Sequence, residues 1–166
     1  MSLIPKGGND RVMTPPALAK AIVKEVYPVG LVLEPCRGTG NIFKELPQGA
    51  EWCEIDEGKD FFKWTEKVDW IVTNPPFSQW RKFLKHSMEV AEVGIAFLCT
   101  INHLWLKARM RDIREAGWQI QSIYTIDGPI EGWPQSGFQV GVIVLRKVNM
   151  VVGGSCYIGP LKGYSQ

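Results

Sequence analysis

Four short apolar runs alternate with helix-like segments over the first two thirds of this sequence, and this alternation limits the fold more than any other feature. The runs cover residues 31–35, 50–55, 68–73 and 94–101. Strands that alternate with helices are joined by right-handed crossovers into a mostly parallel sheet that helices cover on both faces. The sequence therefore predicts an α/β doubly wound fold, in which ligands bind beyond the carboxyl ends of the strands.

Residues 41–46, after Gly40, leave room for a short helix of barely two turns before Pro47, and three other segments have the pattern of longer helices. Thr14-Pro15-Pro16 is typical of a helix start, with Thr14 as the N-cap and proline in the first turn. Apolar residues recur at helical spacing between residues 80 and 91. A third helix, over about residues 104–116, is expected to end at Gly117, where glycine readily takes a left-handed conformation.

The C-terminal third has a different pattern. Two strand-like runs, residues 119–126 and 140–147, follow one another without a helix between them. They predict an antiparallel hairpin with an enlarged loop over residues 127–138. The tail after Met150 contains two glycine-rich turns and is expected to be loosely structured.

The size and composition fit one soluble domain. The chain has 166 residues, 45% of them hydrophobic and 22% charged, so we expect a single domain over residues 1–166, with a core at 12–147 and a tail at 148–166. The four cysteines form no C-x-x-C pair, which favours a reduced, metal-free, intracellular protein. The net charge of +2 identifies no partner. No run is long enough to span a membrane and the N-terminus has no signal-peptide pattern, so a cytoplasmic location is expected.

The turn Asn74-Pro75-Pro76-Phe77 closes the third strand and can hold an exocyclic amine. Two consecutive prolines remove two N–H donors, so nearby carbonyls are free to accept hydrogen bonds from a ligand. Asn74 adds a side-chain carbonyl, and Phe77 adds a flat face on which a ring can stack. A planar base with an NH2 group fits this set. The simpler interpretation is a proline-rich turn with a core phenylalanine.

The ends of the first two strands suggest a nucleoside site. The loop from Glu34 to Gly40 contains Gly38 and Gly40, which let a ligand approach the backbone, although it is neither a P-loop nor a full G-x-G-x-x-G motif. Glu54, after the second strand, can accept hydrogen bonds from ribose hydroxyls. Ile55 and Phe61 can pack on an adenine ring, and Asp60 can accept from its amine. Asp60 could equally cap a short helix.

Taken together, these motifs resemble the S-adenosylmethionine-dependent methyltransferases that modify the N6 amine of adenine in DNA. Asn74-Pro75-Pro76-Phe77 is similar to the family's [DNS]-P-P-[YFW] motif, and Leu33 to Gly40 is similar to its cofactor loop. Thr14-Pro15-Pro16 precedes that loop, which is the gamma-type motif order. Trp133-Pro134-Gln135 resembles the aromatic-Pro-Gln stretch near the last strand pair. The resemblance covers about residues 12–147 and implies a Rossmann-like class I methyltransferase sheet.

The resemblance also implies roles for particular residues. Cofactor binding would fall to Thr14, Glu34, Pro35, Cys36, Gly38, Gly40, Glu54, Ile55, Asp60 and Phe61. Thr14 would contact the methionine carboxylate, Glu34 and Gly38 would line the amino-acid end, and Glu54 would hold the ribose. The catalytic set would be Asn74, Pro75, Pro76 and Phe77.

In that set, Asn74 and the Pro75 carbonyl would accept hydrogen bonds from the target amine and aim its lone pair at the sulfonium methyl. Phe77 and Trp133 would stack on opposite faces of a flipped adenine. No catalytic histidine is needed, so His86 and His103 are interpreted as structural or surface residues.

The sequence departs from the family in two respects. Only five residues separate Glu54 from Asp60, too few for a parallel crossover, so one edge strand and its crossover helix are expected to be missing. Nothing after residue 150 is long enough for a target-recognition domain. We expect a minimal, phage-like catalytic domain whose DNA specificity comes from loops, a specificity subunit or a homodimer.

Three other functions remain open from the sequence. Adenine in RNA and glutamine amides in proteins present the same NH2 group, although a second stacking ring at Trp133 favours a purine. A non-catalytic, cofactor-binding subunit that contacts nucleic acid is the third alternative, and it would explain the lost sheet edge.

Overall fold

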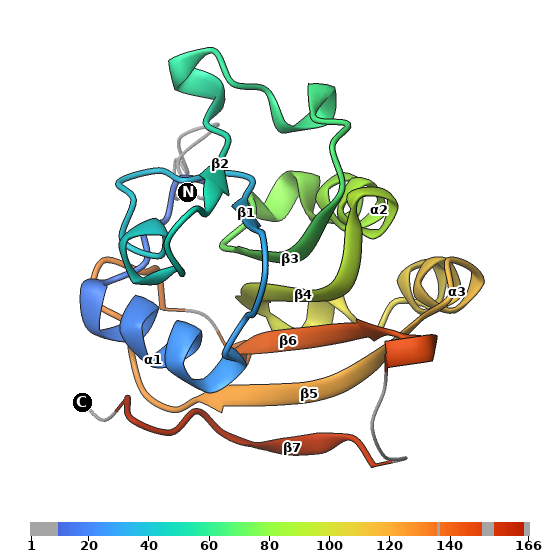
Figure 1. The fold of residues 1–166 in the computed structure, drawn as a ribbon. Coiled ribbons are helices and arrows are strands. Elements are labelled where there is room, and N and C mark those ends of the chain that lie inside the picture. The colour runs from blue at the N-terminus through green and yellow to red at the C-terminus, as the bar shows by residue number, and fades with distance from the viewer. Residues whose placement is uncertain (1–9, 136, 151–154, 165–166) are drawn as a thin grey trace, which may run out of the picture.

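The computed structural model describes residues 10–135, 137–150 and 155–164. In this part of the chain, seven strands form one sheet in the order β2-β1-β3-β4-β6-β5-β7 (Figure 1). The strands are β1 (Val32–Glu34), β2 (Glu51–Trp52), β3 (Val68–Thr73), β4 (Ala91–Thr100), β5 (Trp118–Ile126), β6 (Val140–Lys147) and β7 (Tyr157–Pro160). The α-helices are α1 (Pro16–Val26), α2 (Trp80–Val90) and α3 (Lys107–Glu115).

The sheet is mostly parallel. Strands β2, β1, β3 and β4 run parallel to one another, while β6 runs antiparallel to both β4 and β5. The β5–β6 pair is the predicted hairpin, and its partners run from Trp118↔Lys147 to Ile126↔Val140. The mixed α/β fold class predicted from the sequence is therefore confirmed.

Helices lie on both faces of the sheet. Successive strand residues point to opposite faces, so neighbouring residues of one strand contact different helices. On one face, α1 packs with Trp70 and Val72 of β3. On the other face, α2 and α3 pack with Ile71 of the same strand. Figure 1 shows α1 in front of the sheet, with α2 and α3 beyond it at the right. Two apolar layers thus hold the carboxyl ends of β1 and β3 in fixed positions.

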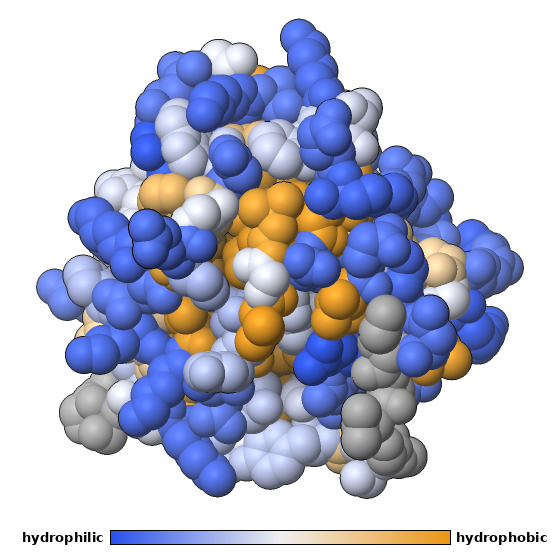
Figure 2. Space-filling view, viewed as in Figure 1, coloured by the Kyte–Doolittle hydropathy of each residue, from blue (hydrophilic) through white to orange (hydrophobic). Residues whose placement is uncertain are grey.

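The polarity of the surface matches this layering. Figure 2 shows hydrophilic side chains over most of the view of Figure 1, with apolar side chains gathered near its middle, over β1 and β3. Among the exposed apolar residues are Val29 (64%) and Leu31 (39%), which directly precede β1. Within the described residues, no helix has the length and apolar character needed to cross a membrane.

The start of α1 differs from the prediction, because Thr14 is not its N-cap. Pro15 occupies that position in an extended conformation (φ −59°, ψ 147°) without any side-chain capping bond. A residue that precedes proline is driven out of the helical region, and both Thr14 and Pro15 precede one. The helix therefore begins at Pro16, and the Thr14 hydroxyl is left for another partner.

Between β1 and β3, a fully described stretch of the chain forms three short 3-10 turns and no α-helix. The expected helix after Gly40 is only the turn Phe43–Glu45, and Ile55–Glu57 and Phe61–Lys63 follow β2. Among the described strands, β2 is the edge next to β1 and is only two residues long, shorter than the predicted run of 50–55. The expected loss of an edge strand and its crossover helix agrees with this topology.

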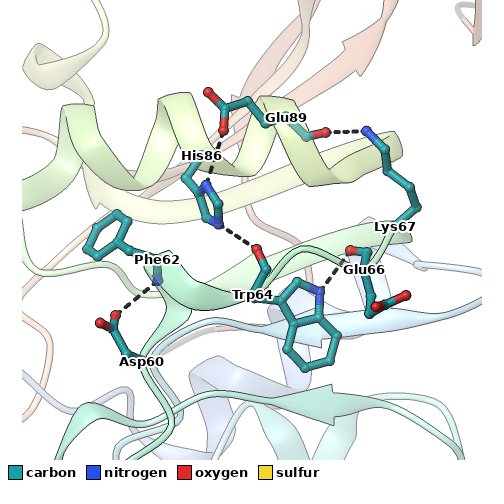
Figure 3. Close-up of polar contacts among 7 residues, drawn as sticks. All are labelled: Asp60, Phe62, Trp64, Glu66, Lys67, His86 and Glu89. Carbon is teal, nitrogen blue, oxygen red and sulfur yellow. Dashed lines mark hydrogen bonds and ion pairs between the residues drawn. The ribbon is translucent and has the colours of Figure 1, made fainter.

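Residues 53–67, which connect β2 to β3 where a crossover helix was expected, are held against α2 (Figure 3). Nε2 of His86 is 2.9 Å from the Trp64 carbonyl oxygen, and its Nδ1 is 3.2 Å from Oε2 of Glu89. Lys67 donates to the backbone oxygen of Glu89 at 2.5 Å. His86 thus joins the turn after β2 to α2 and has a structural role.

Two further predictions were wrong in detail. The third helix begins at Lys107 rather than near residue 104, because Ile101–His103 forms a separate 3-10 turn. The tail expected to be loosely structured contains β7, which pairs in parallel with β5 over Ser122↔Tyr157 to Thr125↔Pro160. The side chains of β7 are mostly exposed, so this strand lacks the apolar run by which the other strands were predicted.

Candidate functional site

A cavity of about 310 Å³ lies at the carboxyl ends of β1, β2 and β3. Its walls come from the N-terminal segment 10–14, the loop 34–42, the residues 54–62 after β2, and the turn after β3 with the first residues of α2. The predicted site residues among the lining are Thr14, Glu34, Pro35, Cys36, Glu54, Ile55, Asp60, Phe61, Asn74 and Pro76. Those that do not line it are Gly38, Gly40, Pro75, Phe77 and Trp133.

Glu34 is the most unusual residue in the cavity wall. It is the last residue of β1, its exposure is 2%, and Oε2 has no hydrogen-bond partner. Burial raises the pKa of Glu34 to about 9. An unpaired buried acceptor is costly, and a ligand cation would both satisfy the oxygen and restore the carboxylate. The carboxyl group is therefore suited to bind an ammonium group in the cavity.

The glycines of the loop after β1 shape the cavity instead of lining it. Gly38 has φ +52°, and a Cβ atom there would lie 2.9 Å from the Met13 sulfur. Its N–H donates to Oε2 of Glu54 at 2.7 Å, which ties the loop to the end of β2. Gly40 also has positive φ, +80°. Both positions favour glycine because their φ angles are positive. The sequence predicted that a ligand would approach these glycines closely, but the group that lies close to Gly38 is the Met13 side chain.

The residues after β2 present acceptors and apolar groups to the cavity. Glu54 accepts from the backbone of Gly38 and, at 3.3 Å, of Asp56, so its orientation is fixed by two N–H groups. Asp60 accepts from the Phe62 N–H at 3.0 Å and lines the cavity as well, so its two interpretations are compatible. Ile55 is 64% exposed at the rim. This wall can contact a flat, polar-edged group.

Phe61 and Cys36 complete the lining near the sheet. Phe61 is buried and its ring stacks on Phe83 with centroids 5.3 Å apart. The Cys36 sulfur is 3.0 Å from the Thr73 hydroxyl and donates to the Asn74 carbonyl at 3.2 Å. Burial raises the pKa of the Cys36 thiol, so it remains a neutral thiol. Cys36 therefore supports the turn that follows β3.

The Asn74 amide has a defined polarity. Its Nδ2 donates to the Val12 carbonyl at 2.7 Å and to the Thr14 hydroxyl oxygen at 3.3 Å. Within the described part of the chain, Oδ1 of Asn74 and the Pro75 carbonyl accept no hydrogen bond from the protein. Two acceptors thus remain for a ligand amine at the turn.

Phe77 and Trp133 lie next to each other beside the cavity. Their ring centroids are 5.8 Å apart and the planes meet at 63°, an edge-to-face contact. A base between two rings needs them parallel and farther apart, so this pair is not preformed for a sandwich. Trp133 also lines a second cavity, within the loop 126–140, and its Nε1 donates to the Met13 carbonyl at 2.8 Å. His103 contacts Phe77 at 5.8 Å between ring centroids, and burial beside Arg109 lowers its pKa.

The sequence did not indicate the N-terminal segment Asp10–Met13 as part of the site. It crosses the cavity wall and contacts Asn74, Ser78 and Trp133. These contacts connect side chains to backbone over 60 or more positions in sequence. Only the nearness of the segment to Thr14 could have suggested it.

Several solved structures that share this fold are named as methyltransferases. The protein PH1948 of Pyrococcus horikoshii, assigned as an RNA methyltransferase, is 18% identical with a TM-score of 0.62, over 88% of this chain and 89% of that one. The M protein of the type I restriction enzyme EcoKI is 15% identical with a TM-score of 0.60, over 85% of this chain but 45% of that one.

Magnesium protoporphyrin IX methyltransferase from Synechocystis PCC 6803, with S-adenosylmethionine bound, is 12% identical with a TM-score of 0.55, over 78% of this chain and 75% of that one. No family model matches the sequence, and no curated protein is significantly similar to it. With identities this low, the comparisons establish the class I methyltransferase fold.

Proposed function

We propose that the protein transfers a methyl group from S-adenosylmethionine to the N6 amine of adenine in DNA. The observation that carries this proposal is that two oxygen atoms in the wall of one cavity accept no hydrogen bond from the described part of the protein. Oε2 of Glu34 is buried without a partner, and Oδ1 of Asn74 is left without one by the bonds of its own Nδ2. The first suits an ammonium group and the second suits an amine.

The cavity residues fit S-adenosylmethionine. Glu34 would hold the ammonium of its methionine part, and Glu54, fixed by two backbone N–H groups, would accept from the ribose hydroxyls. Asp60 would accept from the adenine amine while Ile55 and Phe61 contact the ring. The magnesium protoporphyrin methyltransferase with this fold binds the same cofactor, which supports the assignment. When bound, the cofactor supplies a methyl group on a sulfonium, an activated leaving group.

The acceptor amine would be held by the turn after β3. Oδ1 of Asn74 and the Pro75 carbonyl can each accept one of the two N–H bonds of an exocyclic amine. These bonds draw the nitrogen lone pair away from conjugation with the ring, so it becomes a better nucleophile. No ionisable group is required at the amine, because positioning supplies most of the acceleration and the proton leaves to water after transfer.

An adenine amine fits this site better than a glutamine amide, and DNA is the proposed source of the adenine. Phe77 and Trp133 provide two aromatic rings beside the turn, and a purine offers more stacking area than a glutamine amide. For a base to enter, Trp133 would have to turn from its edge-on contact, and base stacking can offset that. The likeness to the M protein of a type I restriction enzyme supports DNA. A separate specificity subunit or a homodimer would select the sequence.

Adenine in RNA is the second candidate. The solved structure assigned as an RNA methyltransferase is matched over 89% of its length, against 45% for the M protein. Adenine in DNA and adenine in RNA would present the same N6 amine to the turn after β3. They differ only at surfaces that contact the sugar and phosphate.

Asn74→Ala tests the proposal. We expect this variant to bind S-adenosylmethionine with wild-type affinity in calorimetric titration, because the cofactor groups contact other residues. Methyl transfer should fall by at least about 100-fold, because the principal acceptor for the amine is gone. Asn102→Ala, at an exposed asparagine, is the matched control. Full activity of Asn74→Ala on every acceptor, or no cofactor binding by the wild type, would refute the proposal.

A further inference from the structure

The N-terminal segment from Asp10 to Thr14 makes hydrogen bonds to Asn74, Ser78 and Trp133, at and beside the acceptor site. We propose that this segment, which we name the positioning strap, fixes the polarity of the Asn74 amide, with Asp10 as the residue that anchors it. The inference rests on the proposed function, because it concerns the group that would grip the target amine. It gives a role to residues 10–13, to which the sequence assigned none, and a different role to Thr14.

The amide of Asn74 could face the acceptor with either end. Only the Oδ1 end can accept hydrogen bonds from an amine, while the Nδ2 end would repel it, donor against donor. The strap decides between them, because the Val12 carbonyl and the Thr14 hydroxyl oxygen both receive hydrogen bonds from Nδ2, at 2.7 and 3.3 Å. A flipped amide would set Oδ1 against the Val12 carbonyl oxygen. The strap therefore directs the acceptor atom towards the ligand side.

Asp10 ties the strap to the same turn. Its carboxylate accepts from the Ser78 backbone N–H at 3.0 Å and also from the Ser78 hydroxyl. Ser78 lies only four residues after Asn74, in the 3-10 turn Phe77–Gln79 that leads into α2. Hydrogen bonds to a charged acceptor are about twice as strong as neutral ones, and Asp10 makes two. The anchor thus fixes Val12 relative to the turn it serves.

The other contacts of the strap are weaker or lead elsewhere. Arg11 pairs with Asp56 at 2.8 Å, but the two side chains are 71% and 56% exposed, and such surface pairs contribute little. The Met13 carbonyl accepts from Trp133, which joins the strap to the loop that would stack on the base. Asp10 is therefore the residue whose loss should free the strap while the cavity walls formed by residues 34–42 and 54–62 stay in place.

Asp10→Ala and Asp10→Asn separate positioning from simple structural support. We expect Asp10→Ala to lower kcat for methyl transfer by about 10- to 100-fold, because Asn74 is no longer held with Oδ1 outward. The Kd for S-adenosylmethionine should change by less than about threefold, since Glu34 and Glu54 contact neither Asp10 nor Ser78. Asp10→Asn keeps an oxygen that accepts from the Ser78 backbone, and should recover most of the loss. Glu115→Ala, which removes an exposed carboxyl at the end of α3 outside the cavity lining, is the control.

A readout without catalysis keeps the two proposals distinct. In 15N-labelled protein, the side-chain amide signals of Asn74 are identified by their absence in Asn74→Asp. We expect slow solvent exchange of these protons in the wild type and at least tenfold faster exchange in Asp10→Ala. Ser78→Ala, which removes one of the two bonds, should be intermediate and serves if Asp10→Ala does not fold.

Unchanged amide exchange in both variants, or a kcat for Asp10→Ala within twofold of the wild type, would overturn the positioning strap. A protein that transfers no methyl group to any acceptor, but shows the expected exchange pattern, would refute the proposed function and leave the strap standing. Loss of cofactor affinity without loss of kcat would assign the strap to the cofactor instead and would equally overturn the inference.

Discussion

Replacing Glu34 with glutamine should make the protein more stable and its cofactor binding weaker. Burial raises the pKa of Glu34 to about 9 from an ordinary value of 4.5, so the folded protein keeps a proton that the unfolded chain has lost. The contribution of Glu34 to the free energy of unfolding is therefore fully present below pH 4.5, and it is lost as the pH rises towards 9. Glutamine has a similar shape and does not titrate.

The magnitude follows from the proton linkage. Each pH unit between the two pKa values costs the wild type about 1.4 kcal/mol relative to Glu34→Gln. The gap in free energy of unfolding should thus be near zero at pH 4.5 and reach about 4 kcal/mol at pH 7.5 as an upper figure. Saturating S-adenosylmethionine should narrow this gap, because its ammonium stabilises the wild-type carboxylate and not the amide.

Urea unfolding at pH 5.5, 6.5 and 7.5, with and without the cofactor, measures these differences. Glu45→Gln, at an exposed carboxyl in the neighbouring turn, controls for the change of charge. A stability gap that stays constant with pH would show that Glu34 is not buried without a partner. Equal cofactor affinity of Glu34→Gln and the wild type would show that the carboxyl does not bind the ammonium.

Three further outcomes are expected. Between pH 6 and 7, binding of S-adenosylmethionine should release about one proton from Glu34, and the affinity should increase with pH. Titration calorimetry in two buffers of different ionisation enthalpy detects the released proton. If no proton is released, the role of Glu34 is contradicted. Gly94→Ala should lose about 1–3 kcal/mol in urea unfolding, because its Cβ would lie 2.4 Å from the Trp70 ring, whereas Gly137→Ala, with no atom within 4 Å, should lose little; equal losses would refute this packing argument. Trp133→Ala should lower kcat/KM for the acceptor about tenfold while leaving the Kd for the cofactor unchanged, and an unaltered kcat/KM would exclude Trp133 from base stacking.

Most of the sheet could be predicted because its residues carry strong local signals. Residues 68–73 and 140–147 match β3 and β6 at both ends, since β-branched and apolar residues run between clear turn signals. Most of the cavity wall could also be predicted from the sequence, because the loops that follow the strands of a parallel sheet meet at one edge. Glu34, Glu54 and Asn74 each follow or end a strand, and the fold brings them to one cavity.

The remaining features depend on contacts that leave no local pattern. Thr14 looks like an N-cap, but the two prolines after it move the helix start to Pro16 and free its hydroxyl for Asn74. Asp10 reaches Ser78 across 68 positions, and Trp133 reaches Met13 across 120. Such pairings are set by tertiary packing, which neither periodicity nor composition encodes.

The central claim is tested most directly by identifying the methylated product. Protein, S-adenosylmethionine with a deuterated methyl group, and duplex DNA, single-stranded DNA, RNA or protein acceptors are incubated in parallel, and the products are digested for mass spectrometry. We predict labelled N6-methyladenine in DNA with the wild type and none with Asn74→Ala. Label on another base or on glutamine, or equal label with the Asn74 variant, would contradict the account.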